Sequence, residues 1–317
     1  MKRRESLVAL AALALGAPVA ARAQPAPRRV VIFLRAPVFA EAVAAGLRER
    51  GWVGGRNLAL EMVGKFTPES LPKEVAAAIA RGAEVIVTAT PELIAAAAKQ
   101  TQSVPIVGLD FESDPVSAGF ARSLARPGGN ITGIWLDLPE LCGKNVELLR
   151  ELIPGLNSIG AIWDERQGPV QFNALQSVTR GGIKLQSAPL READEVETAI
   201  ERLKRDGAKA VVVFTGSTTF FNRERIVQAA LKQGLPLASL FPIFPDAGAL
   251  LAYGANPADM FKRLAGHVDR ILRGAKAGEI PIERPVRFEL VINLKTAKAL
   301  GITIPQSVLL RADRVIE

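Results

Sequence analysis

The chain is poor in the side chains on which most catalytic and metal sites depend. Its 317 residues include one histidine, His267, and one cysteine, Cys142. A single cysteine permits no intramolecular disulfide, so the folded core must suffice without a covalent cross-link. Without a second histidine, a Ser-His-Asp triad and a histidine-based metal centre lack their usual groups. We therefore expect no metal, no cofactor and no enzymatic activity, with His267 in a structural or solvated role and Cys142 as a small buried apolar residue.

Aromatic residues make up only 5% of the chain, and no stripe of lysine and arginine with interleaved aromatics is present. A surface that binds nucleic acid usually shows such a stripe, so we do not expect nucleic acid as a partner. Hydrophobic residues make up 49% of the chain, which is enough for two domains with cores of their own. After the N-terminal segment no run of about 18 apolar residues occurs, so we expect a soluble mature protein without a membrane anchor.

The first 23 residues show the pattern of a cleaved signal peptide. Residues 2–4 are basic, residues 7–20 are apolar, and Ala-Arg-Ala at 21–23 has the small-x-small pattern of a cleavage site. We expect the mature chain to begin at Gln24 and to reside in the periplasm, after export by the general or the twin-arginine route. The net charge of +8 then falls to +5, because the signal contains four basic residues and one acidic residue.

Apolar strands alternate with amphipathic helices along the rest of the chain. The run Val-Val-Ile-Phe-Leu at 30–34 is typical of a strand buried on both faces of a parallel sheet, and a helix is expected over 39–50. The same alternation predicts strands over 58–63, 84–88 and 105–110, with helices over 71–81 and 90–99 between them. This β-α-β rhythm predicts a doubly wound parallel sheet with right-handed crossovers.

The stretch 114–149 is expected to carry the chain from one lobe to another. It predicts a short helix, a turn at residues 127–130 (Pro-Gly-Gly-Asn), a strand through Ile134 and a new helix from about Pro139. The alternation then resumes, with strands expected at 158–163, 184–189, 210–214, 235–240 and 249–253, a long helix at 257–273, and final segments at 288–292, 294–300 and 309–316. We therefore predict two doubly wound α/β lobes. The N-terminal lobe comprises residues 24–133 and 255–284, and the C-terminal lobe comprises residues 134–254 and 285–317.

Two lobes of this kind turn the carboxyl ends of their strands toward a shared cleft, where ligands of such sheets bind. Thr88 ends one strand, and Thr90 is expected at the N-cap of the next helix, with Pro91 at its first position. The free N–H groups of that first turn attract carboxylates, although a threonine cap with nothing bound gives the same pattern. Thr215 and Ser217 follow the clearest strand of the second lobe and occupy the corresponding place there.

Asp110, Glu112 and Asp114 cluster after another expected strand end. Such carboxylates could bind a ligand ammonium group or serve acid–base chemistry, and Asp114 could instead cap a helix that follows Pro115.

Aromatic residues also lie near predicted strand ends, which suggests a ligand with an apolar or ring-bearing body, although core packing explains each of them equally well. These aromatic residues are Phe39, Phe111, Trp135, Trp163, Phe241 and Phe244. The complete set of candidate ligand contacts is Arg35, Phe39, Thr88, Thr90, Asp110, Asp114, Trp135, Asp137, Asp164, Thr215, Ser217 and Phe241.

Two strings in the chain resemble signatures of one bacterial family. They are ARSLARPGGNITG at 121–133 and FELVINLKTAKALG at 288–301, and they are similar to motifs of the ABC-transporter substrate-binding proteins of the tryptophan/tyrosine-binding type. The resemblance covers essentially the whole mature chain and implies a type I periplasmic-binding-protein fold with three crossings between the lobes. This chain has Arg-Ala-Pro at 35–37, where the family usually has a longer loop with Gly and Ser. That loop normally faces the ligand, so ligand identity does not carry over.

The resemblance implies a receptor rather than an enzyme. We predict a monomeric periplasmic protein that closes on a small organic ligand and delivers it to an ABC permease in the inner membrane. The ligand is expected to be an amino acid, including an aromatic one, or else a dicarboxylate or an aromatic acid without an amine, because Arg35 adds a cation. A sensory protein that presents its closed form to a signalling receptor and an enzyme that uses the carboxylate cluster remain the alternatives.

Overall fold

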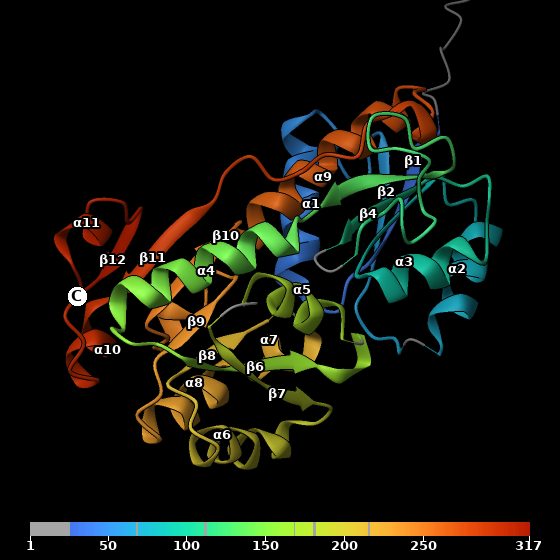
Figure 1. Cartoon of the computed structure of the whole chain (residues 1–317). Helices are drawn as coiled ribbons and strands as arrows, with labels where there is room; N and C mark the ends of the chain where they lie inside the picture. Colours follow the sequence, from blue (N-terminus) through green and yellow to red (C-terminus); the bar gives the residue numbers. More distant parts are fainter. Residues whose placement is uncertain (1–25, 68, 111–112, 168, 180–181, 215) are drawn as a thin grey trace, which may run out of the picture.

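The computed structural model describes residues 26–67, 69–110, 113–167, 169–179, 182–214 and 216–317 (Figure 1). The expected signal peptide and the expected mature terminus at Gln24 therefore lie outside the described residues. Among the residues that are described, no helix combines the length and the apolar character needed to span a bilayer.

The first lobe is built on a five-stranded sheet in the order β2-β1-β3-β4-β5, in which all neighbours run parallel. Its strands are β1 Arg28–Phe33, β2 Leu58–Val63, β3 Val85–Ala89, β4 Ile106–Asp110 and β5 Ile131–Trp135. The helices between them are α1 Pro37–Glu49, α2 Leu71–Ala80 and α3 Pro91–Ala98. The expected alternation of buried strands and amphipathic helices is confirmed here, with boundaries shifted by a few residues at most.

Alternate side chains of β1 enter two separate cores. Val30 and Ile32 belong to the core that α1 and α9 (Pro257–Leu272) cover, whereas Val31 and Phe33 belong to the core under α2 and α3. This is the period-two consequence of a strand that is covered on both faces. The four residues are fully buried, which explains why the sequence of β1 is a continuous apolar run.

The second lobe contains a seven-stranded sheet in the order β12-β11-β10-β9-β8-β6-β7. Its strands are β6 Ser158–Asp164, β7 Lys184–Leu190, β8 Ala210–Val213, β9 Leu237–Ser239, β10 Leu251–Gly254, β11 Glu289–Asn293 and β12 Arg314–Ile316. The prediction of a parallel sheet needs one correction, because β10 and β11 pair antiparallel while the other neighbours are parallel. The reason is that β11 enters the sheet after the chain has returned from the first lobe, so no crossover helix within the second lobe sets its direction.

Helices cover the second sheet on both faces (Figure 1). They are α4 Leu138–Leu152, α5 Val170–Thr179, α6 Val196–Arg205, α7 Ser217–Phe221, α8 Arg223–Lys232, α10 Leu294–Ala299 and α11 Gln306–Leu309. Single turns of 3₁₀ helix lie at η1 Glu165–Gln167, η2 Ala193–Glu195, η3 Pro245–Ala247 and η4 Ala277–Glu279. Helix α4 packs on α5 and on strands β9 and β10, which places its apolar stripe in the core of this lobe.

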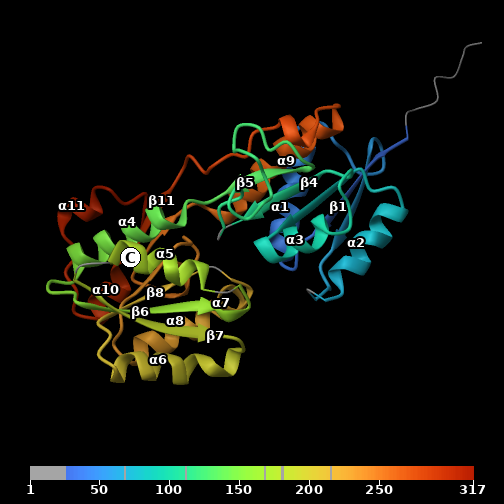
Figure 2. The same cartoon turned by 45° about the vertical axis from the view of Figure 1, so that its right-hand side comes forward.

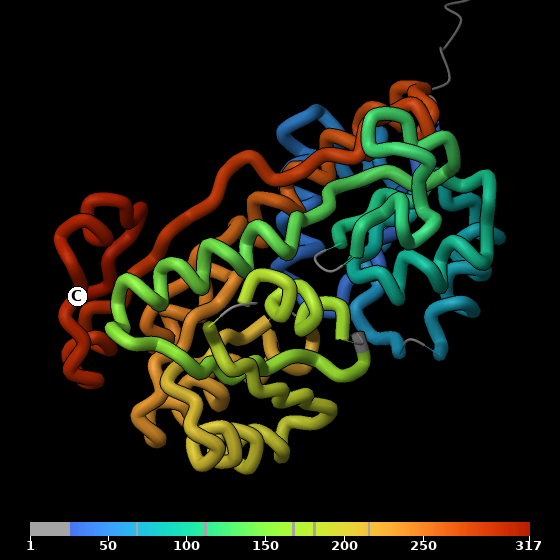
Figure 3. Tube along the Cα trace, in the orientation of Figure 1, coloured from blue at the N-terminus to red at the C-terminus, as the bar shows by residue number. Residues whose placement is uncertain are grey.

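The chain passes between the two lobes three times, as Figures 2 and 3 show. The first passage joins β5 to α4, the second joins β10 to α9, and the third runs from the end of the first lobe to β11. Helix α9 packs against α1 and the first sheet, although it follows β10 in the chain. Glu283, on the third passage, exchanges backbone hydrogen bonds with Gly133 and Trp135 of β5, and Arg284 forms an ion pair with Asp137 at 2.6 Å. The first and third passages are therefore bonded to each other.

One sequence prediction for local structure is wrong. Residues after Asp114 form turns instead of a short helix, because Asp114 accepts the backbone N–H of Ser117 at 2.6 Å and closes a turn there. The final segment at 309–316 comprises the end of α11 and the short strand β12, which pairs with β11 over three residues.

Candidate ligand-binding site

A cavity lies between the two lobes, at the carboxyl ends of β1 and β3 on one side and next to α7 on the other. It has a volume of about 630 Å³, part of which is open to solvent. Its lining comprises Leu34, Arg35, Ala36, Phe39, Ala89, Thr90 and Leu93 of the first lobe, Gly216, Ser217, Phe220, Phe221 and Phe241 of the second lobe, and Pro257 and Phe261 at the start of α9. The cavity is therefore formed only when both lobes face each other, as expected for strand ends in parallel sheets.

Phenylalanine rings form most of the apolar wall. Five of the 13 phenylalanines of the chain line this cavity. Phe39 of α1 stacks on Phe261 with ring centroids 4.5 Å apart, and it lies 5.2 Å from Phe220 of the opposite lobe. Phe221 meets Phe220 edge to face and is 54% exposed, so it marks the rim of the cavity. Such a wall suits a ring or another flat apolar group.

Arg35 supplies the charge of this cavity. It lies in the loop between β1 and α1, is half-buried, and donates a hydrogen bond from Nη2 to Oγ of Ser217 at 2.7 Å. Because these two residues belong to different lobes, the bond joins the lobes across the cleft. The predicted contacts Arg35, Phe39, Thr90, Ser217 and Phe241 thus come together around one cavity.

The expected cap at the start of α3 is confirmed. Thr90 is the N-cap residue, Oγ1 of Thr90 accepts the N–H of Leu93 at 3.5 Å, and Pro91 is at the first helical position. Thr90 is also the one described residue other than glycine with a positive φ, +69°. Thr88 lies two residues earlier, on β3, and is fully buried. Its Oγ1 donates to the carbonyl of Phe33, so Thr88 supports the sheet and does not line the cavity.

A polar hollow adjoins the aromatic cavity and shares Arg35, Thr90 and Ser217 with it. Its other lining residues are Thr67, Glu69, Glu92, Asp164 and Arg166. Burial raises the pKa of Glu92, and the charge of Arg35 partly offsets this. The other lining residues of the polar hollow thus carry both charge signs, with carboxylates at Glu69, Glu92 and Asp164 and a guanidinium at Arg166.

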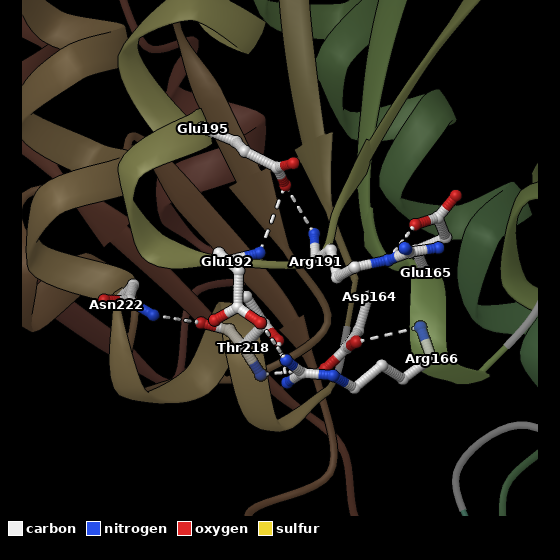
Figure 4. Close-up of polar contacts among 8 residues, drawn as sticks. All are labelled: Asp164, Glu165, Arg166, Arg191, Glu192, Glu195, Thr218 and Asn222. Carbon is white, nitrogen blue, oxygen red and sulfur yellow. Dashed lines mark hydrogen bonds and ion pairs between the residues drawn. The ribbon is translucent and has the colours of Figure 1, made fainter.

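Figure 4 shows how the second lobe holds Asp164 in place. The two carboxylate oxygens of Asp164 accept the backbone N–H groups of Arg166 and Thr218, at 3.2 and 2.8 Å. The guanidinium of Arg166 pairs with Glu192 and approaches the hydroxyl of Thr218 at 3.5 Å. Asp164 is only 2% exposed, so its charge is satisfied internally by the loop that it organises.

The other predicted acidic contacts lie outside the lining of both hollows. Asp110 is fully buried and accepts the N–H and the hydroxyl of Ser113 on its two oxygens. Asp114 is exposed, and its bond to Ser117 lowers the pKa of its carboxyl. Asp137 pairs with Arg284 in the passages between the lobes. Glu112, Phe111 and Thr215 lie outside the described residues.

Several predicted aromatic contacts belong to the cores instead. Trp135 is 1% exposed and packs in the core of the first lobe. Trp163 and Phe244 are likewise buried in the second lobe. Three aromatic residues line the cavity without having been predicted, because they lie on helices and not at strand ends: Phe220, Phe221 and Phe261. A usable signal was present for the first two, which directly follow the loop expected to face the cleft.

Among the described residues, no cluster of His, Cys, Asp or Glu could hold a metal ion. Cys142 is fully buried on α4, and burial raises the pKa of its thiol to about 12. His267 is also buried, on α9, and burial lowers its pKa. Neither residue lines the cavity.

Comparison with known proteins agrees with the signature strings of the sequence. The model of a family described as "ABC transporter substrate binding protein" matches residues 38–316. A tyrosine-binding protein from Clostridioides difficile (strain R20291) is 24% identical over 262 residues, which are 80% of this chain and 74% of the relative.

Solved structures show the same fold. An ABC domain in complex with L-Trp from Streptococcus pneumonia superposes with a TM-score of 0.82 at 21% identity, over 92% of this chain and 99% of that one. A ligand-free, open substrate-binding protein with adhesive properties from Clostridium difficile superposes with a TM-score of 0.66 at 20% identity, over 91% and 99% of the two chains. The fold of this chain is thus one already seen in solved proteins.

Proposed function

The chain belongs to the ABC transporter substrate-binding protein family, and from this premise we propose that it is the periplasmic receptor of an ABC importer. Its two lobes would close on a small organic ligand that carries a carboxylate and an apolar or aromatic body. The closed form would then deliver the ligand to a permease in the inner membrane. Export by a cleaved signal peptide and action as a monomer belong to the same proposal.

The observation that carries this proposal is the composition of the cavity between the lobes. Phenylalanine rings from both lobes surround it, and the guanidinium of Arg35 enters it from one side. A guanidinium in a partly dry pocket favours a carboxylate, with which it forms two parallel hydrogen bonds. The names of the relatives point in the same direction, since one is called tyrosine-binding and one holds L-Trp.

The contacts across the cleft explain how binding would favour closure. The bond from Arg35 to Ser217 and the ring contact from Phe39 to Phe220 both join the lobes. A ligand that contacts both lobes binds the closed state more tightly than the open state. Its binding therefore shifts the open–closed equilibrium toward the closed state.

A thermal-shift screen tests the proposed ligand class. We expect stabilisation by aromatic amino acids or aromatic acids, since a ligand at 100 times its Kd stabilises the folded state by about 2.7 kcal/mol. Sugars and divalent metal ions serve as controls. Stabilisation by these controls alone would remove the basis for a carboxylate ligand.

Small-angle X-ray scattering tests the closing movement. The radius of gyration should fall when a ligand from the screen is added, because the two lobes approach each other around it. The variant Phe220→Ala removes a ring contact across the cleft, so ligand-dependent compaction should be weaker in it. Chemical turnover of the ligand at many equivalents per protein would favour the enzyme alternative instead.

A further inference from the structure

We propose that this receptor selects aromatic monocarboxylates that lack an amine, the deaminated counterparts of aromatic amino acids, and that Arg35 is the residue that determines this preference. This inference rests on the proposed function and narrows its ligand class. It follows from the balance of charges around the cavity, which offers a cation to a carboxylate and offers no available anion to an ammonium group among the described lining residues.

Arg35 has unused hydrogen-bonding capacity. Its guanidinium carries five N–H donors, of which one is directed to Ser217 in the structure. It forms no ion pair with a described carboxylate, and the nearby Glu92 acts on it only through its charge. Because Arg35 is half-buried beside apolar side chains, its charge is only partly hydrated. A ligand carboxylate can therefore pair with it while the bond to Ser217 keeps the guanidinium in position.

The acidic side chains near the cleft have internal partners. Asp164 uses both oxygens on the backbone of its own lobe and is 2% exposed. Asp110 uses both oxygens on Ser113 and is fully buried. An ammonium group could bind either carboxylate only by displacing these donors.

Glu69 and Glu92 line the polar hollow and not the aromatic cavity. Both side chains reach solvent, where an ion pair contributes little. Glu92 is nevertheless buried enough at its inner side to raise the pKa of its carboxyl, which makes its negative charge less favourable. Arg166 adds a cation to the same hollow and acts on both carboxylates through its charge. The hollow thus holds three carboxylates, of which Asp164 is already bonded on both oxygens, against the guanidinium groups of Arg35 and Arg166, so a ligand ammonium group gains little net attraction there.

An α-amino acid would place its ammonium group close to its own carboxylate, and therefore close to Arg35. The ammonium group would lose water against phenylalanine rings and would face a like charge. Burial of a charge without a partner is costly, whereas the deaminated acid presents only apolar carbon at that position. The cavity therefore distinguishes two ligands that share the same ring and the same carboxylate.

Isothermal titration calorimetry on matched ligand pairs tests the preference. The pairs are L-phenylalanine with 3-phenylpropanoate and L-tryptophan with indole-3-propanoate. We expect each deaminated acid to bind at least tenfold more tightly than its amino acid. Equal or tighter binding of the amino acids would overturn the inference while leaving the proposed receptor function intact. A lack of binding by all four ligands would overturn the carboxylate class itself.

Variants of Arg35 test its role. In Arg35→Gln, affinity for 3-phenylpropanoate should fall at least tenfold, and the preference for this acid over the neutral 3-phenylpropanamide should disappear. Arg35→Lys keeps the charge and should retain part of that preference, and the melting temperature of each variant reports whether it folds. Arg225→Gln removes a surface cation that pairs with Glu197 outside both hollows, and it is the matched control, with an unchanged preference.

Persistence of the acid-over-amide preference in Arg35→Gln would refute the assignment to Arg35. The variant Glu92→Gln tests whether Glu92 binds a ligand ammonium group. A tenfold loss of L-phenylalanine affinity in this variant would identify an ammonium site at Glu92 and overturn the inference.

Discussion

At the scale of single residues, Thr90 combines a structural constraint with a place in the site. Its φ of +69° and ψ of +145° lie in a region that glycine occupies almost alone. Three features hold it there: its N–H donates to the carbonyl of Leu109 at 2.9 Å, its hydroxyl caps α3, and Pro91 favours an extended ψ in the residue before it. The backbone at the edge of the cavity is therefore held in a costly conformation by its surroundings.

Two substitutions of Thr90 separate the cap from the strain. Thr90→Ala loses the cap and keeps the positive φ, so its unfolding free energy should fall by about 1 kcal/mol. Thr90→Gly also loses the cap but relieves the strain, and it should be more stable than Thr90→Ala by about 1 kcal/mol. Urea denaturation of the three proteins measures both differences. An alanine variant as stable as the glycine variant would show that the φ of Thr90 costs little.

At the scale of elements, β5 depends on a close approach of two backbones. Gly133 on β5 lies beside Gly108 on β4 with a φ of +145°, and a Cβ at Gly133 would be 1.9 Å from the carbonyl oxygen of Gly108. The third passage also contacts Gly133, because the N–H of Glu283 donates to the carbonyl of Gly133 at 2.9 Å. The glycine in the string at 121–133 thus allows the first and third passages to meet at the sheet edge.

Gly133→Ala should therefore destabilise the protein strongly. The added methyl group meets backbone rather than a movable side chain, so we expect a loss of about 3 kcal/mol or more in unfolding free energy. Gly129→Ala is the matched control in the same string, since a Cβ there meets no atom within 4 Å, and it should change stability by about 0.5 kcal/mol or less. Similar melting curves for the two variants would contradict this account of β5.

At the scale of the whole molecule, His267 links α9 to the passages between the lobes. It is buried on α9, with Nε2 lying 3.9 Å from the carboxylate of Glu283 on the third passage. Burial lowers the pKa of His267, the charge of Glu283 opposes this effect, and Arg270 adds to it. Arg263 pairs with Glu283 at 2.8 Å and is also close to the histidine through its backbone.

Stability should accordingly depend on pH through this one histidine. In the unfolded chain His267 takes up a proton below its ordinary pKa of about 6.5, whereas the folded protein keeps it neutral to lower pH. The contribution of neutral His267 is therefore fully present above pH 6.5 and is lost as the pH falls below it, by at most about 1.4 kcal/mol per pH unit.

The variant His267→Gln should lack this pH-dependent contribution to the free energy of unfolding. The difference in unfolding free energy between the wild type and this variant should shrink from pH 7.5 to pH 5.5 in urea titrations. A difference that stays constant or grows over this range would show that the buried histidine is not held neutral.

Much of the fold could be predicted because its signals are local. The apolar run that became β1, the proline-initiated helix α9 and the Thr90 cap are each specified by neighbouring residues through periodicity, backbone restriction and capping. Two long strings in the chain were sufficient to indicate the family, which the match over residues 38–316 confirms.

The tertiary structure alone decided which of the strand-end groups reach the cavity. Arg35 and Ser217 are 182 positions apart in sequence and meet only because the lobes face each other, while Trp135 turns into the first core. Asp110 was an equally good candidate by its position after a strand, yet it is buried on Ser113. The antiparallel entry of β11 followed from the third passage in the same way. Local pattern determines which element a residue belongs to, but the direction and partner of a polar side chain depend on packing between distant segments, which no local pattern encodes.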